Sequence, residues 1–211
     1  MKLFASDLHG TIVYNDKGTQ RSVNETLESM DIQRKVSLQF IRENMGRPWG
    51  DYFTTLFPNA NEDDTGRFVG TVRELSRRYE QQYERLMDHV ADVLPEIKSR
   101  GYKVVVVSIS TKSGIERALH RHRLLYLVDD VLGVDAPLIG GYDIGEHKGR
   151  QLKECIQKFD VDKAIMIGDR EEDVTAGLIA GAMTVYFDRK GRTDPRAMYS
   201  IKDWRELLPV M

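Results

Sequence analysis

One short stretch decides the fold, and it reads Leu3-Phe4-Ala5-Ser6-Asp7-Leu8-His9-Gly10-Thr11. Its first four residues form a mostly apolar run that stops at Asp7, and Gly10 follows shortly after. Short apolar runs that end at turn residues are typical of buried strands. The stretch therefore predicts a buried strand that ends in a carboxylate on a tight loop, where backbone N–H groups can face a phosphate.

Further apolar runs of the same kind lie in the second half of the chain. They are Val104 to Val107, Val131 to Val134, Ala164 to Ile167 and Met183 to Phe187. The first of them is entirely valine, as expected for a central parallel strand that is buried on both faces. Helical patterns separate the runs, and they are Ile115 to Leu124, a helix through Leu152, Ile156 and Phe159, and Val174 to Ala180. This alternation predicts βαβ units and an α/β fold with a doubly wound, mostly parallel sheet.

The interval 14–91 breaks the alternation, because it holds charged helical stretches and no convincing strand. With 211 residues, the chain is long enough for one core and a smaller subdomain. We therefore expect an α/β core of residues 1–13 and 92–211 with an inserted all-helical subdomain of residues 14–91. Its charge run is interpreted as the solvated face of a helix.

The composition excludes several classes of partner. The chain has 31 basic and 33 acidic side chains and a formal charge of −2, so it lacks the basic field of a nucleic-acid-binding protein. The single cysteine, Cys155, fits a reducing compartment and a helix-face position. Neither a signal peptide nor an apolar stretch of membrane-spanning length is seen. We expect a cytoplasmic protein that binds neither membranes nor nucleic acids.

Polar residues follow three of the predicted strands, namely Asp7, Ser108 and Asp169. In an open parallel sheet, ligands bind beyond the carboxyl ends of the strands, so these side chains should converge. Asp173 adds a carboxylate at a helix start, four residues after Asp169. Carboxylate oxygens are ligands that Mg²⁺ prefers.

Two further groups are candidates for binding a phosphate at this edge. Lys148 precedes the helix through Leu152 and offers a cation, while the N–H of Ile109 offers a backbone donor beside the Ser108 hydroxyl. Each of these residue types is common on protein surfaces, so none of them alone indicates a phosphate site. The indication comes from the order of the whole set of polar residues along the chain.

Taken in order, these residues resemble the four motifs of the haloacid dehalogenase-like hydrolase superfamily. Asp7-Leu8-His9-Gly10-Thr11 is similar to the first motif, Asp-x-Asp-Gly-Thr, and Ser108, Lys148 and Gly168-Asp169 with Asp173 are similar to the others. The resemblance implies a Mg²⁺-dependent phosphohydrolase acting on a small phosphorylated metabolite, such as a sugar or organic acid, as a monomer or homodimer.

The resemblance also implies a role for each matching residue. Asp7 would be the nucleophile that forms an aspartyl-phosphate. Magnesium would bind Asp7, the backbone carbonyl of His9 and Asp169, with Asp173 near a metal-bound water. Ser108, Ile109 and Lys148 would bind the phosphoryl oxygens.

The chain departs from the family at His9, because phosphatases of this superfamily carry an acid/base aspartate there. Histidine titrates near neutral pH and can transfer the same protons. Three interpretations stay open. In the first, His9 is the acid/base catalyst of a working phosphatase. In the second, the enzyme is a slow phosphatase or one restricted to good leaving groups such as acyl phosphates, and in the third, the chain binds phosphate esters or regulates without turning them over.

The inserted interval resembles the helical cap of phosphoglycolate phosphatase and β-phosphoglucomutase relatives. In the segment Met45-Gly46-Arg47-Pro48-Trp49, Arg47 is our candidate for a substrate contact, with a plain surface arginine as the alternative. Met45-Gly46 resembles part of phosphonoacetaldehyde hydrolase, but Trp49 stands where that enzyme has its Schiff-base lysine. Haloacid dehalogenases themselves resemble the chain less, because they do not use the metal that Asp169 and Asp173 indicate.

Overall fold

The computed structural model describes residues 1–135, 143–189, 191 and 193–211. These residues divide into two compact units. The first unit comprises residues 1–13, 86–135 and the described residues from 143 onward, and the second comprises residues 14–85. Within the described ranges, no helix has both the length and the apolar character needed to cross a bilayer.

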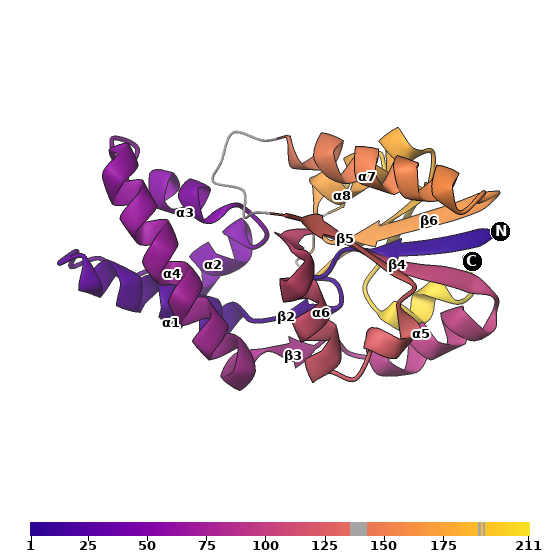
Figure 1. Ribbon diagram of the computed structural model, residues 1–211, viewed down its shortest axis with the longest axis horizontal. Coiled ribbons are helices and arrows are strands. Elements are labelled where there is room, and N and C mark those ends of the chain that lie inside the picture. The colour runs from indigo at the N-terminus through magenta and orange to yellow at the C-terminus, as the bar shows by residue number, and fades with distance from the viewer. Residues whose placement is uncertain (136–142, 190, 192) are drawn as a thin grey trace. The chain divides into compact units, whose positions relative to one another are not determined.

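A parallel sheet forms the centre of the first unit, and its described strands follow the order β5-β4-β1-β6-β7-β8 (Figure 1). The strands are β1 (Lys2–Ser6), β4 (Tyr102–Thr111), β5 (Asp130–Val134), β6 (Lys163–Gly168), β7 (Met183–Phe187) and β8 (Tyr199–Ile201). Central β1 pairs in parallel with β4 on one side and with β6 on the other. The strand order therefore reverses beside β1, which confirms the prediction of a doubly wound parallel sheet.

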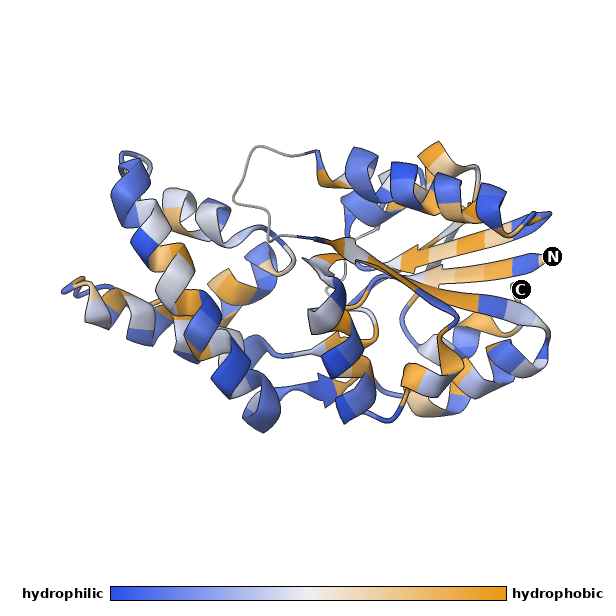
Figure 2. Ribbon diagram, in the orientation of Figure 1, coloured by the Kyte–Doolittle hydropathy of each residue, from blue (hydrophilic) through white to orange (hydrophobic). Residues whose placement is uncertain are grey.

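Helices cover both faces of this sheet (Figure 1). On one face lie α7 (Ile144–Lys158) and α8 (Glu171–Ala180), and on the other lie α5 (Val90–Ser99) and α6 (Lys112–Arg121). Two short 3₁₀ helices, η1 (Leu125–Leu127) and η2 (Trp204–Leu207), complete the unit. The central strands are predominantly hydrophobic along their length, whereas the helices mix hydrophobic and hydrophilic residues (Figure 2). Burial of both sheet faces explains the continuous apolar runs in the sequence.

Alternation along β1 sends its side chains to opposite faces of the sheet. Leu3 and Ala5 pack in one cluster with Leu152 of α7. Phe4, which is fully buried, meets the edge of the Trp204 ring with 6.0 Å between ring centroids. The strand that leads to Asp7 is thus packed on both sides.

The second unit is helical and has its own core. Its helices are α1 (Asp16–Ser29), α2 (Leu38–Asn44), α3 (Trp49–Leu56) and α4 (Glu62–Tyr83). The rings of Phe53 and Phe68 stack at its centre with centroids 4.8 Å apart. Ser37 and Asn61 cap α2 and α4 by accepting hydrogen bonds from backbone N–H groups of the first turn.

The structure differs from the sequence analysis at the ends of the inserted interval. Two-residue strands, β2 (Val13–Tyr14) and β3 (Arg85–Leu86), form a small sheet where the chain passes between the units. The second unit ends at residue 85, whereas the sequence suggested residue 91, which lies within α5. Residues 86–91 are too few to show a helix or strand period that would mark this boundary in the sequence.

Candidate active site

The candidate nucleophile, Asp7, follows β1 at the point where the strand order reverses. Its backbone N–H donates to the carbonyl of Ile167 in β6 over 2.9 Å, so the end of the neighbouring strand fixes its position. The side chain is 5% exposed. A carboxylate is thereby held, almost out of solvent, where α/β sheets bind ligands.

The loop after Asp7 is tight and closely packed. Gly10 has φ +99°, and its N–H donates to the carbonyl of Val13 over 2.7 Å. A Cβ atom at Gly10 would lie 2.5 Å from both carboxylate oxygens of Asp169, so only glycine fits this position. The buried indole N–H of Trp204 donates to the carbonyl of Thr11 over 3.0 Å and ties the loop to the C-terminal segment.

Two more carboxylates reach the same place from β6 and α8. Asp169 follows β6, and Asp173 lies in the first turn of α8, where its carboxylate accepts from the N–H of Arg170 over 3.2 Å. Asp7, Asp169 and Asp173 each offer an oxygen within 4.8 Å of the others. The structure thus brings together the three carboxylates that the sequence selected.

Lys148 lies between these carboxylates, and its Nζ donates to Asp7 over 2.6 Å and to Asp173 over 2.7 Å. The sequence analysis placed Lys148 before a helix, and this was wrong, because α7 begins at Ile144 and includes it. The close contact of α7 with α8 needs Gly149, where a Cβ would lie 2.8 Å from Ile179. This contact brings the ammonium group to the carboxylates.

Burial and charge set the protonation of this cluster. Burial on its own lowers the pKa of Lys148, but the carboxylates of Asp173 and Asp7 outweigh it and raise that pKa above its ordinary value. Burial raises the pKa of Asp173 to about 7, with the charges of Asp7 and Asp169 adding to the effect and Lys148 opposing it. The ammonium of Lys148 thus contacts two of the three carboxylates, and the carboxylates outnumber it.

Comparison with known proteins identifies the family. The sequence profile described as haloacid dehalogenase-like hydrolase matches residues 4–187. The chain belongs to the haloacid dehalogenase-like hydrolases. The predictions of this family and of an enzyme are therefore confirmed.

Relatives of this hydrolase span its whole length at low sequence identity. Pyrophosphatase PpaX of Bacillus thuringiensis (strain Al Hakam) is 23% identical over 213 residues, which cover 95% of each chain. A solved haloacid dehalogenase-like hydrolase from Streptococcus pneumoniae superposes with a TM-score of 0.83 at 18% identity, covering 99% of this chain and 97% of the other. A structure described as a predicted phosphoglycolate phosphatase from Haemophilus somnus gives a TM-score of 0.83 at 18% identity, with coverages of 100% and 97%.

Ser108 and Ile109 of this hydrolase lie near the end of β4, the strand beside β1. The sequence analysis ended this strand at Ser108, but β4 continues to Thr111, with a shift of its register against β5 after Val107. Ser108 is buried, and its Oγ accepts from the N–H of Ser110 over 3.2 Å, while Ile109 is half-buried. The irregular strand end thus presents polar groups at the edge where β1 ends.

His9 is half-buried, and its Nδ1 lies 3.5 Å from Oγ of Ser110. Ser110 was not among the predicted site residues, although the alternation Ser108-Ile109-Ser110 puts both hydroxyls on one side of a strand. Arg170 was not among them either, and its half-buried guanidinium pairs with Glu172. Burial lowers the pKa of Arg170, but this pairing outweighs it and raises the pKa above its ordinary value. The charges of Asp173 and Asp169 also raise the pKa of Arg170, so its guanidinium interacts with the carboxylate cluster.

Arg47 belongs to the second unit, where it is exposed between α2 and α3. Burial raises the pKa of Asp51, and the positive charge of Arg47 opposes this effect. The contact of Arg47 with a substrate stays a prediction.

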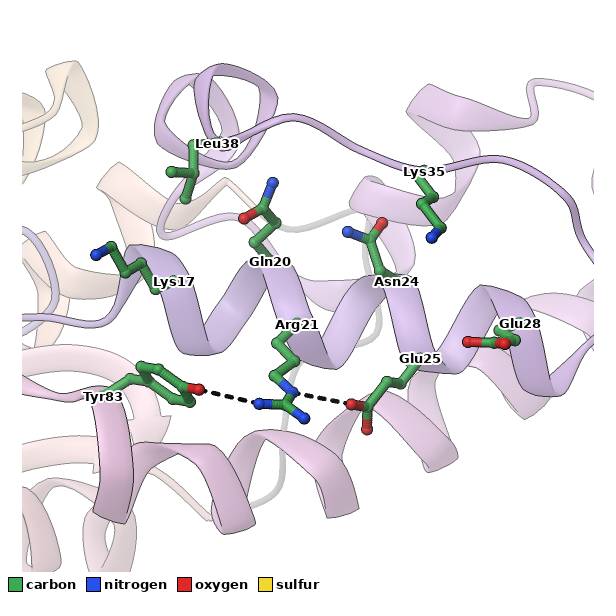
Figure 3. Close-up of a pocket in the computed structure, with 9 residues that line it drawn as sticks. All are labelled: Lys17, Gln20, Arg21, Asn24, Glu25, Glu28, Lys35, Leu38 and Tyr83. Carbon is green, nitrogen blue, oxygen red and sulfur yellow. Dashed lines mark hydrogen bonds and ion pairs between the residues drawn. The ribbon is translucent and has the colours of Figure 1, made fainter.

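The second unit also has a polar groove of about 430 Å³, and none of the predicted site residues lines it (Figure 3). In the groove, Arg21 lies between Glu25 and Tyr83 and donates to each over 3.0 Å. The hydroxyl of Tyr79 donates to Glu25 and holds the pKa of that carboxyl below its ordinary value. The charged and hydroxyl groups of Arg21, Glu25, Tyr79 and Tyr83 are thus occupied by hydrogen bonds to one another. The carboxylate cluster of the first unit is therefore the stronger candidate for an active site.

Proposed function

We propose that this hydrolase is a Mg²⁺-dependent phosphohydrolase that acts on small phosphorylated metabolites through an aspartyl-phosphate on Asp7. One observation carries the proposal: Asp7, Asp169, Asp173 and Lys148 form a buried cluster at the carboxyl end of the central strands. Buried charges are costly, so such a cluster is expected where a ligand or a reaction needs it.

The residues present fit magnesium. The three carboxylates of the cluster outnumber its one ammonium group, which suits a cation, and carboxylate oxygens are the ligands that Mg²⁺ takes. Asp7, Asp169 and the backbone carbonyl of His9 would hold the ion, with Asp173 contacting it through water. When bound, the ion would neutralise charge on the phosphoryl oxygens.

The reaction has two steps. In the first, a carboxylate oxygen of Asp7 attacks phosphorus, the bond to the leaving oxygen breaks, and His9 gives that oxygen a proton. In the second, water attacks the same phosphorus, His9 takes a proton from the water, and the bond between phosphorus and Asp7 breaks. Free phosphate is released and Asp7 is regenerated.

Positive and hydrogen-bonding groups support both steps. Lys148 already contacts Asp7 over 2.6 Å, so its charge lies beside the attacked phosphorus. Ser108 and the N–H of Ile109, in the adjacent strand β4, would donate to phosphoryl oxygens. Stabilisation of this kind supplies most of the catalysis in phosphoryl transfer.

His9 favours a second, narrower candidate function, hydrolysis of substrates with good leaving groups. Acyl phosphates and phosphoanhydrides need little proton donation when their bond breaks. The relatives named pyrophosphatase make inorganic pyrophosphate a reasonable substrate to test first. A binding or regulatory protein without turnover is the rival from another class.

A phosphate-release screen tests the proposal. The panel contains pyrophosphate, an acyl phosphate, an aryl phosphate and several alkyl phosphates, each with Mg²⁺ and with a chelator. We expect Mg²⁺-dependent release by the wild type and a loss on the order of 10³-fold or more in Asp7→Asn, which keeps the side-chain volume. Wild-type activity in Asp7→Asn would contradict the mechanism. No release by folded, Mg²⁺-bound protein would favour the binding protein.

A further inference from the structure

His9 lies on the loop after β1, and Ser110 lies in the last part of the neighbouring strand β4. β1 and β4 pair in parallel with Ser6 opposite Val106, so the loop after β1 and the end of β4 lie at the same edge of the sheet. There the Oγ of Ser110 lies 3.5 Å from Nδ1 of His9. This is the long limit of a hydrogen bond, and catalytic hydrogen bonds commonly shorten when substrate binds.

Both partners of this contact are anchored through their backbones. The N–H of Ser110 donates to Oγ of Ser108 over 3.2 Å. The backbone of His9 forms a bridge with Val13, and the next residue, Gly10, donates to the carbonyl of Val13. The contact therefore joins the loop after β1 to the end of β4 and restricts the side-chain torsions of His9.

An imidazole needs such a partner, whereas an aspartate in its place does not. The two oxygens of a carboxylate are equivalent, so either can face the substrate. The two nitrogens of an imidazole are distinct, and the hydrogen bond made by one sets the role of the other. A hydroxyl can both donate and accept, so Ser110 can contact Nδ1 in either tautomer of the ring.

We propose that Ser110 is a positioning residue that holds His9 through Nδ1 and leaves Nε2 for the oxygen atoms of the substrate. This inference rests on the proposed function, in which His9 transfers protons. It assigns to Ser110 a role that acts through His9 alone.

A double-mutant cycle on an alkyl phosphate tests this role. Ser110→Ala is expected to lower kcat roughly 3- to 10-fold, the effect of one lost hydrogen bond, with little change in KM. The same substitution made in His9→Ala is expected to change nothing further. Ser110→Thr keeps a hydroxyl and should retain activity, and Ser113→Ala removes an exposed hydroxyl nearby and should act as the wild type. Equal losses from Ser110→Ala in both backgrounds, or no loss in either, would overturn the proposal.

A second measurement does not depend on turnover. A histidine ¹⁵N spectrum, with His9 assigned from the His9→Ala variant, reads the two ring nitrogens directly. Ser110→Ala should shift the His9 signals, and Ser113→Ala should leave them in place. If the wild type released no phosphate while Ser110→Ala shifted these signals, the proposed function alone would fail. Unchanged His9 signals would overturn the positioning role.

Discussion

The buried carboxylate cluster of the first unit and an exposed ion pair of the second unit show two different uses of charged side chains. In the first unit, Asp7, Asp169, Asp173 and Lys148 are each at most 5% exposed. In the second unit, the paired side chains of Arg67 and Asp64 are 65% and 43% exposed. Burying a charge costs several kcal/mol per ion, whereas an exposed pair contributes about 1 kcal/mol or less. The buried charges of the cluster therefore do not exist for stability alone, and we assign them to function.

Among the substitutions considered next, the largest effect is expected on the turnover rate when His9 is replaced. We expect His9→Ala to lower turnover of an alkyl phosphate by ~10² to 10⁴-fold, the usual contribution of general acid–base catalysis. The loss should be much smaller on an acyl or aryl phosphate, whose leaving group needs little protonation. Steady-state kinetics on matched substrates measure both effects.

Two results would change the role of His9. Equal rates for the wild type and His9→Ala on an alkyl phosphate would show that His9 transfers no proton. A large gain in turnover for His9→Asp would show that the histidine lowers activity on a phosphatase scaffold.

Removal of Lys148 should affect both stability and catalysis. Lys148→Ala leaves Asp7 and Asp173 without their buried cation, which costs about 3 to 5 kcal/mol of unfolding free energy in comparable buried pairs. The inhibition constant for inorganic phosphate should also rise. Lys158→Ala is the matched control, because Lys158 lies on the same helix in an exposed pair with Asp130. An unchanged inhibition constant in Lys148→Ala would remove Lys148 from the phosphate site.

The raised pKa of Asp173 leads us to expect that stabilisation of the fold by Mg²⁺ depends on pH. Its pKa is raised by burial from 3.8 to about 7, so the metal-free protein loses stability as the pH rises through this range. Magnesium balances the charge, so it should raise Tm more at about pH 8 than at about pH 5. Thermal unfolding measures this, and Asp173→Asn should weaken the dependence. The same Mg²⁺ shift at both pH values would contradict the charge account.

The smallest effect is expected in the second unit. Arg67→Ala removes one partner of an exposed pair with an N–O distance of 3.8 Å, so the unfolding free energy should change by about 1 kcal/mol or less. Chemical denaturation of Arg67→Ala and Lys148→Ala under the same conditions compares the two unfolding free energies. An equally large loss of unfolding free energy in Arg67→Ala would remove the contrast between the exposed pair and the buried cluster.

The sequence was sufficient to predict the parallel sheet because its signals are local. The all-valine run Val104 to Val107 and the apolar run that ends at Asp7 each predict a strand by themselves. The end of a strand in turn places its polar residue at the ligand-binding edge, so Asp7 and Asp169 were identified correctly as neighbours.

Other features depend on contacts between distant parts of the chain. The bond from Trp204 to the carbonyl of Thr11 has no local signal in the sequence. Strands of two or three residues, such as β2 and β8, are too short to show a period. The apolar positions of α7 show a clear helical spacing only from Leu152 onward, so they do not mark its start at Ile144. The cap does mark it, because Asp143 accepts from the N–H of Glu146.

A crystal structure grown with Mg²⁺ and beryllium fluoride, a mimic of the phosphoryl group, tests the central claim most directly. The account predicts Mg²⁺ within ~2.0 to 2.1 Å of carboxylate oxygens of both Asp7 and Asp169, with the fluoride complex on Asp7 and Lys148 beside it. Carboxylates of Asp7 and Asp169 that point away from each other, or a metal bound elsewhere, would contradict it.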